Sequence, residues 1–149
     1  MLTLLAQEAT MASIFTKIIA GELPGHFVWK DEVCFAIMTI QPIRAGHVIL
    51  VPNQEINHWD DVPPATAAYL MQTAQHIAKA IKANVTCKRI GVMVVGLEVP
   101  HTHIHLTPID NFADMDFKNS KALPQHELAA MATLIRTTLV SAGHKSAQL

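Results

Sequence analysis

The chain has 149 residues, of which half are apolar and 15% are charged, and its formal net charge is −1. This length suits one domain that folds without disulfide or metal cross-links. The near-neutral charge argues against a nucleic-acid polymer as partner, because phosphate backbones are bound by clustered Lys and Arg. No stretch approaches the ~20 apolar residues of a membrane span, so we expect no membrane partner either.

The predicted organisation is a flexible N-terminal tail at 1–11 followed by a single domain at 12–149. The tail has no Lys or Arg and too short an apolar run for a secretory signal, and Met11 is a candidate alternative start. Cys34 and Cys87 lie far apart with no C-x-x-C motif, which favours reduced thiols. We therefore expect a cytoplasmic protein.

The first half of the domain predicts one short helix and three strands. Ser13 is suited to cap a helix over 14–20, with Ile14, Phe15 and Ile18 facing inward and Gly21 at its end. The pattern of β-branched and aromatic residues predicts strands at 27–29, 33–38 and 47–51. A loop at 39–46 lies between the second and third strands, and an irregular segment at 53–62 comes after the third.

The second half predicts two longer helices around two strands. From Pro63, apolar residues recur at three and four positions as far as Ile81, which indicates a long amphipathic helix. Strands are expected at 91–96 and 101–108, then a loop at 109–123, and Pro124 opens a last helix that ends at Gly143. We predict an α+β domain, an antiparallel sheet with one long helix packed on it.

Nine histidines are the unusual feature of the composition, and three of them lie within five residues. On a strand, His101, His103 and His105 share one face with neighbours ~6.6 Å apart, while Thr102, Ile104 and Leu106 face the core. His47 is ambiguous, because it begins an apolar strand. The remaining five are interpreted as surface residues: His26, His58, His76, His126 and His144.

Two chemistries suit this histidine row (His101, His103 and His105). Three imidazoles can hold a catalytic Zn²⁺, but the outer rings lie ~13 Å apart unless the strand bends. Alternatively, one neutral imidazole acts as a nucleophile toward phosphorus while its neighbours donate hydrogen bonds to phosphoryl oxygens. The second chemistry needs spaced rings, and it fits the row better.

The segment HTHIHLT (101–107) resembles the signature of the histidine triad (HIT) family, in which three histidines alternate with apolar residues. The resemblance extends to SIFTKIIAGELPG (13–25), to VCFAIMTIQPIRAGHVILVP (33–52) and to GVMVVG (91–96). It covers residues 12–110 and constrains 111–149 only weakly. The sequence is most similar to the nucleoside-phosphoramidase-like (HINT-like) branch of the family.

The resemblance implies a HIT-like α+β fold in which two protomers form a homodimer by joining their sheets. It also implies cleavage of a phosphoramidate or phosphoanhydride bond at the α-phosphate through a nucleotidyl-histidine intermediate. His103 would be the nucleophile, His105 a phosphate donor and His47 a fourth active-site histidine, while the His101 carbonyl would orient the nucleophile's ring. Seven residues would contact the nucleotide: Ile14, Phe15, Ile18, Ile37, Thr39, Ile40 and Glu98.

Three departures from the family pattern affect these expectations. Thr39 stands where an Asp commonly accepts from the ribose hydroxyls, so ribose recognition should be weaker or different. Glu98 lies in a shortened turn before the row, where it could repel a phosphate or serve as an acid toward the leaving group. Ser13 and Thr16 replace a cysteine pair that holds zinc in some members, so we expect neither a metal nor another cofactor.

The sequence thus predicts a nucleotide hydrolase or nucleotidyl transferase acting on a purine nucleotide or nucleoside phosphoramidate. One alternative is a nucleotide-binding HIT protein with little catalysis, favoured by Thr39 and the altered turn. A second alternative is a hydrolase that uses the same histidines to hold a metal.

Overall fold

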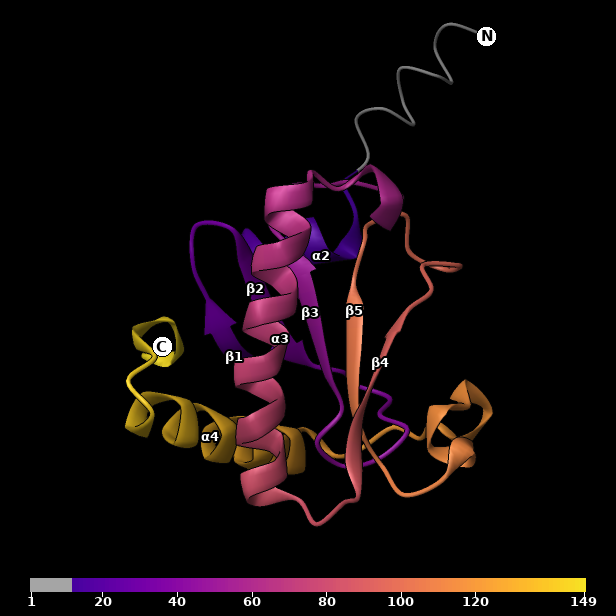
Figure 1. Cartoon of the computed structure of the whole chain (residues 1–149), viewed down its shortest axis with the longest axis vertical. Helices are drawn as coiled ribbons and strands as arrows, with labels where there is room; N and C mark the ends of the chain where they lie inside the picture. The colour runs from indigo at the N-terminus through magenta and orange to yellow at the C-terminus, as the bar shows by residue number, and fades with distance from the viewer. Residues whose placement is uncertain (1–11) are drawn as a thin grey trace, which may run out of the picture.

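The computed structural model describes residues 12–149, and the predicted tail at 1–11 lies outside them. One antiparallel sheet forms the centre of the domain, with strand order β1-β2-β3-β5-β4 (Figure 1). The predicted α+β class is confirmed. The strands are β1 (Phe27–Lys30), β2 (Cys34–Met38), β3 (Val48–Pro52), β4 (Arg89–Val94) and β5 (Ile104–Ile109).

Strands β2 and β3 lie at the middle of the sheet and are buried along their whole length. Because successive side chains alternate between faces, their continuous apolar sequences supply two cores. Ala36 and Leu50 belong to the larger core on one face. Phe35 and Val51 belong to a smaller core on the other face. A slip of one residue in β2 or β3 would exchange the two sets of side chains.

Helix α3 (Pro64–Asn84) covers the face that carries the larger core, running along the strands (Figure 1). The predicted final helix is present as α4 (Gln125–Ser141), which packs against α3 and β1. Met71 and Leu134, which the periodicity places inside, are 47% and 48% exposed. Among residues 12–149, no helix is long and apolar enough to cross a bilayer.

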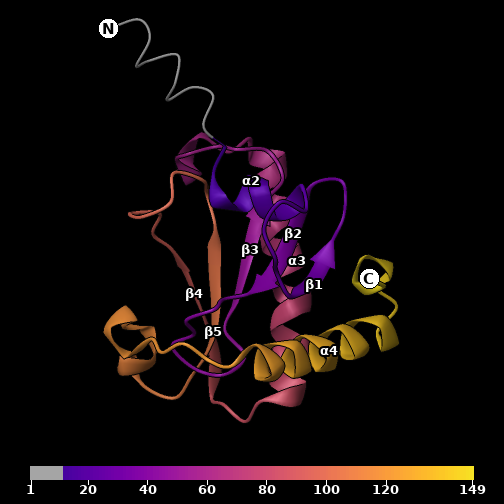
Figure 2. The same ribbon diagram turned by 180° about the vertical axis from the view of Figure 1, so that it is seen from behind.

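The short helix α2 (Ile14–Ile19) lies on the opposite side of the sheet from α3, as Figure 2 shows. The Ser13 side chain accepts a hydrogen bond from the Thr16 amide, as predicted for a capping residue. The inward assignment of Ile14 is wrong, because it is 48% exposed while Phe15 is buried in the smaller core. Gly21 follows the helix with φ +82°, a left-handed conformation that glycine adopts without strain.

The strand that carries the histidine row is shorter than predicted. β5 begins at Ile104, and its pairing with β3 starts at the Leu50–Ile104 pair. His101 and His103 therefore precede the strand, in a connection that begins after Val94 and contains Pro100, which has no amide hydrogen to donate. The sequence pattern alternates through this segment, but alternation alone does not supply a hydrogen-bonded neighbour.

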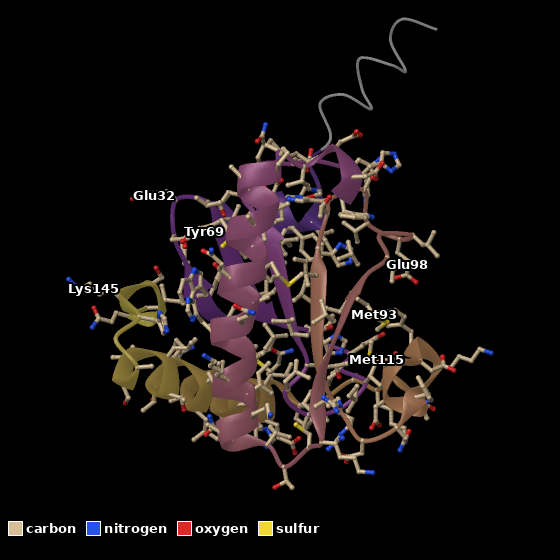
Figure 3. All side chains as sticks on the ribbon, viewed as in Figure 1. Glu32, Tyr69, Met93, Glu98, Met115 and Lys145 are labelled. Atoms are coloured by element: carbon tan, nitrogen blue, oxygen red, sulfur yellow. The ribbon has the colours of Figure 1, made fainter. Side chains whose placement is uncertain are left out.

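The segment after β5 is more ordered than the predicted loop. It contains two single-turn 3₁₀ helices, η2 (Phe112–Met115) and η3 (Phe117–Asn119). Met115 lies beside β4 near Met93 (Figure 3) and packs so closely on Gly91 that a Cβ there would collide with its sulfur. The remaining 3₁₀ turns are η1 (Trp59–Asp61) in the irregular segment and η4 (Lys145–Ala147) near the C-terminus.

Candidate active site

A cavity of about 810 Å³ opens on the face of the sheet opposite α3. Its walls come from α2, from the ends of β2 and β3 with the loop between them, from the β4–β5 connection and from the row. Three of the four predicted catalytic histidines line it, namely His47, His103 and His105. The seven residues predicted to contact the nucleotide line it as well: Ile14, Phe15, Ile18, Ile37, Thr39, Ile40 and Glu98.

The ring of His103 is fixed by its own backbone neighbourhood. Its Nδ1 lies 2.7 Å from the carbonyl oxygen of His101. Because a carbonyl only accepts, Nδ1 carries the hydrogen and Nε2 keeps its lone pair. Burial lowers the pKa of His103, so the ring is neutral at pH 7. Together these contacts prepare one nitrogen to attack an electrophile in the cavity.

His105 and His47 form a second fixed unit beside it. The backbone amide of Ile43 donates to Nδ1 of His47 at 3.1 Å, so His47 carries its hydrogen on Nε2. That Nε2 donates to Nδ1 of His105 at 3.0 Å. The remaining hydrogen of His105 is therefore on Nε2, the nitrogen left free of this chain of bonds. Burial lowers the pKa of His47 to about 4 and that of His105 to about 3, so both rings act as neutral donors.

His101 differs from the other two members of the row. It is fully buried and does not line the cavity. Its Nε2 donates to the carbonyl of Pro52 at 2.8 Å, and its Nδ1 lies 2.6 Å from the Ser13 hydroxyl. The expectation that the three rings share one face of a strand is therefore wrong. Two rings face the cavity, and the third lies behind them.

The ring contacts continue on both sides of the two cavity-lining imidazoles. The ring centroid of His103 lies 4.9 Å from that of His105 and 4.9 Å from that of Phe15. On the other side, Phe117 contacts His105 edge to face at 4.9 Å. The two imidazoles are thus bracketed by phenyl rings, which cover part of their surface and leave them only 7% and 8% exposed.

Phe117 was not predicted as a site residue, because the Asp- and Asn-rich stretch around it is typical of a loop. The stretch is instead held in place by Arg44, whose guanidinium lies 2.9 Å from Asp110 and 3.3 Å from Asp114. Asn111 and Asp114 also form a reciprocal capping box at the start of η2. The Asn-x-x-Asp spacing was the local signal that this segment is folded.

His26 was also assigned to the surface, and the structure corrects this. It lines the rim of the cavity, and its Nε2 lies 2.7 Å from Oε1 of Gln125.

His76 and His144 are likewise half-buried, with ring centroids 4.3 Å apart. Trp29 lies against both rings, at 6.3 Å and 5.4 Å. We call Trp29, His76 and His144 the outer ring cluster. His58 and His126 are exposed, as predicted.

Two of the three departures from the family pattern, Thr39 and Glu98, line the cavity. Thr39 is half-buried, and its hydroxyl lies 3.4 Å from the amide of Gln41. Glu98 is exposed on the β4–β5 connection, at the outer side of the molecule (Figure 3). Its carboxylate is therefore accessible to solvent.

The geometry also bears on metal binding. Within residues 12–149, no group of three or more His, Cys, Asp or Glu side chains is placed to hold a metal ion. Both ring nitrogens of His47 and of His101 already have protein partners, as does one nitrogen of His105. The ring nitrogens of these histidines are thus directed at partners within the protein rather than at one common point.

The buried side chains of His47, His103 and His105 lie against one face of the sheet, where the interior strands β3 and β5 meet the cavity. The HIT domain family matches residues 20–112. The chain therefore belongs to the HIT family, as the resemblance of its sequence implies.

Two curated relatives carry an activity in their names. The chain is 30% identical over 109 residues to adenosine 5'-monophosphoramidase HNT1 of Saccharomyces cerevisiae, covering 71% of this chain and 69% of the relative. It is 28% identical over 100 residues to adenylylsulfatase HINT3 of Arabidopsis thaliana, covering 64% of this chain and 51% of the relative. The chain thus spans about half the length of the plant protein.

Solved structures show the same fold. A Hit-like protein involved in cell-cycle regulation from Bartonella henselae is 28% identical, with a TM-score of 0.74 over 85% of this chain and 95% of that one. A histidine triad nucleotide-binding protein from Sulfolobus tokodaii has a TM-score of 0.78 over 89% of this chain and 95% of that one, at 23% identity. The similarity to the Sulfolobus tokodaii structure supports the shared fold alone.

Proposed function

We propose that the protein hydrolyses nucleoside phosphoramidates, or transfers their nucleotidyl group, through a covalent intermediate on His103. The observation that carries this proposal is the Nδ1–H bond from His103 to the His101 carbonyl, which leaves Nε2 as a free lone pair inside the cavity. The named activities of the yeast and plant relatives support a nucleotide substrate cleaved at its α-phosphate.

In the first step, Nε2 of His103 forms a bond to the α-phosphorus and the bond from phosphorus to the leaving nitrogen breaks. The electron pair of that bond stays on the departing amine, which takes a proton from solvent. The imidazole becomes positively charged, so its Nδ1–H bond to the His101 carbonyl strengthens as the reaction proceeds. An interaction that is stronger in the transition state than in the ground state accelerates the step.

In the same step, His105 and His47 stabilise the phosphoryl group. Nε2–H of His105 donates to a phosphoryl oxygen, and His47 keeps that hydrogen in place by donating to the other nitrogen of the ring. Fixed donors at a developing negative charge need no reorganisation during the reaction. In the second step, water attacks phosphorus and loses a proton to solvent, while the bond to His103 breaks and its electron pair returns to Nε2, which releases the nucleoside monophosphate.

The apolar walls suit a purine base. Ile14 and Ile40 are 48% and 63% exposed although both line the cavity, so they have apolar surface that a bound base would cover. Thr39 offers one hydroxyl to the ribose in place of a carboxylate, which favours weaker ribose binding. Glu98 lies where it contacts solvent, and we assign it to the leaving-group side of the cavity.

The second candidate function is nucleotide binding with little catalysis, which Thr39 and the short β4–β5 connection favour. Calorimetric titration with AMP and GMP separates the two candidates. Tight binding without turnover of any phosphoramidate would support the second.

Two further expectations remain proposals. We propose that two copies join their sheets through β4, which is an edge strand and leaves Val92 45% exposed. Light scattering of the protein in solution tests this, with the mass of two chains as the expected result. The free thiols of Cys34 and Cys87 are consistent with a cytoplasmic location.

The direct experiment is to incubate the protein with adenosine 5'-phosphoramidate and follow the release of AMP. The wild type should release AMP, and His103→Ala should not. His126→Ala is the matched control, because it removes an exposed histidine from α4. Equal inactivity of wild type and His103→Ala toward purine phosphoramidates, dinucleotides and sugar nucleotides would contradict the proposal.

A further inference from the structure

A polar cluster lies behind His103 and His105, outside the cavity, and no step above uses its side chains. It consists of Ser13 and Thr16 at the start of α2, Glu55 after β3, and the ring of His101. The Glu55 carboxylate accepts from the Ser13 amide and, at 3.0 Å, from the Thr16 hydroxyl. The Ser13 hydroxyl lies 2.6 Å from Nδ1 of His101. Three segments far apart in the sequence therefore meet at one buried imidazole.

The direction of each hydrogen bond in this cluster follows from its partners. Nε2 of His101 faces the Pro52 carbonyl, which only accepts, so Nε2 carries the hydrogen. Nδ1 of the neutral ring must then accept, and the Ser13 hydroxyl donates to it. Burial lowers the pKa of His101 despite the Glu55 carboxylate 3.9 Å away, which keeps the ring neutral and this arrangement fixed.

The backbone of His101 needs this support because it has no strand neighbour. The pairing of β3 with β5 begins at Ile104, so the ladder does not hold residues 101–103. Hydrogen bonds to the segment after β3 take the place of strand pairing here, since both the amide and the hydroxyl of Thr102 donate to the Ile56 carbonyl. The position of the His101 carbonyl, and with it the ring of His103, depends on these side-chain contacts.

We propose that Ser13 and Glu55 are positioning residues, which hold the His101 carbonyl where it aims Nε2 of His103 at the α-phosphorus. Glu55 fixes the first turn of α2 through its hydrogen bonds to Ser13 and Thr16. The Ser13 hydroxyl, placed in this way, then fixes the ring of His101 by donating to Nδ1. The same contacts set the wall residue Phe15, whose ring lies 5.7 Å from that of His101. This inference rests on the proposed function for its kinetic consequence, but not for its structural one.

The structural consequence is measured on the free protein. A bond from Nδ1–H to a carbonyl favours the protonated ring, and the contact to His101 raises the pKa of His103 against the larger effect of burial. Loosening that contact should therefore lower the pKa of His103. An NMR titration of the imidazole nitrogens in Ser13→Ala should show this fall, and Glu55→Gln should show a smaller one.

The kinetic consequence is a split between kcat and KM. For Ser13→Ala and adenosine 5'-phosphoramidate, kcat should fall roughly tenfold, the size of one hydrogen bond between neutral groups, while KM changes little. Ser13→Thr keeps the hydroxyl and should recover most of kcat. Thr138→Ala is the stability control, because it loses hydrogen bonds on α4 away from the site.

The outcomes are distinguishable. Glu55 has a 37% exposed side chain, so Glu55→Gln should fold even if the loss of the helix cap unfolds Ser13→Ala. An unchanged His103 pKa in both variants would overturn the positioning role, with or without activity. An inactive wild type whose His103 pKa still shifts in the variants would instead contradict the proposed function alone.

Discussion

Two groups of histidines lie on opposite faces of the same sheet, and they use the same side chain differently. In the site, His47, His103 and His105 have directed hydrogen bonds that decide which nitrogen carries hydrogen. In the outer ring cluster, His76 and His144 meet Trp29 through ring faces and edges. The fixed tautomers of the site histidines give each ring a defined donor and a defined lone pair. The rings of the outer cluster contact one another, and we interpret them as packing residues.

The largest expected difference between the two groups concerns turnover. His105→Ala removes the proposed donor to the phosphoryl group, so kcat should fall by about 10²–10³-fold. His76→Ala removes a ring of the same size from the other face and should leave kcat unchanged. Steady-state rates with adenosine 5'-phosphoramidate measure both. Equal losses in the two variants would show that fixed tautomers do not distinguish the groups.

The second difference concerns stability in acid. The folded pKa of His47 is about 4 against an ordinary value of 6.5, so the unfolded chain binds more protons between these values. Stability is fully present above about pH 6.5 and falls as the pH drops toward 4, by up to about 1.4 kcal/mol per pH unit for one such ring.

His47→Gln tests this acid sensitivity, since it keeps an N–H donor beside His105 and removes a titrating ring. Its free energy of unfolding in urea should decline less steeply than that of the wild type between pH 7 and pH 5. Parallel declines would mean that His47 is not held neutral by the fold.

Sequence patterns predicted the sheet because the central strands are continuous apolar runs that suit only a buried position. The family pattern also selected His103 and His47 as candidates, and both line the cavity, while their catalytic roles stay a prediction. The burial of the His101 ring behind the cavity was not predictable, because its partners, the Ser13 hydroxyl and the Pro52 carbonyl, lie 88 and 49 positions away. Phe117 was missed for a similar reason, since its position depends on ion pairs between Arg44 and a distant acidic segment.

The exposed apolar side chains on the two faces should also differ in their effect on binding. Ile40 lines the cavity and is 63% exposed, whereas Met71 lies on α3 and is 47% exposed. Ile40→Ser should weaken AMP binding about tenfold, which corresponds to ~1.4 kcal/mol of lost apolar contact. Met71→Ser should leave the affinity unchanged in the same calorimetric titration. Equal affinities in both variants would place the base elsewhere.

The smallest expected effect belongs to the outer ring cluster. His144→Ala removes a ring packed against both Trp29 and His76, and it should lower the free energy of unfolding by about 1 kcal/mol. Urea unfolding followed by tryptophan emission measures this change. A simultaneous loss of kcat would contradict the division of the histidines into a chemical group and a packing group.

The central claim is that turnover passes through a covalent bond to His103. The most direct measurement is the stereochemistry at phosphorus, using a nucleoside phosphorothioamidate of one configuration hydrolysed in heavy-oxygen water. Two successive displacements, first by His103 and then by water, invert the configuration twice and predict overall retention. Overall inversion would mean that water attacks phosphorus directly, and it would contradict the nucleophilic role of His103.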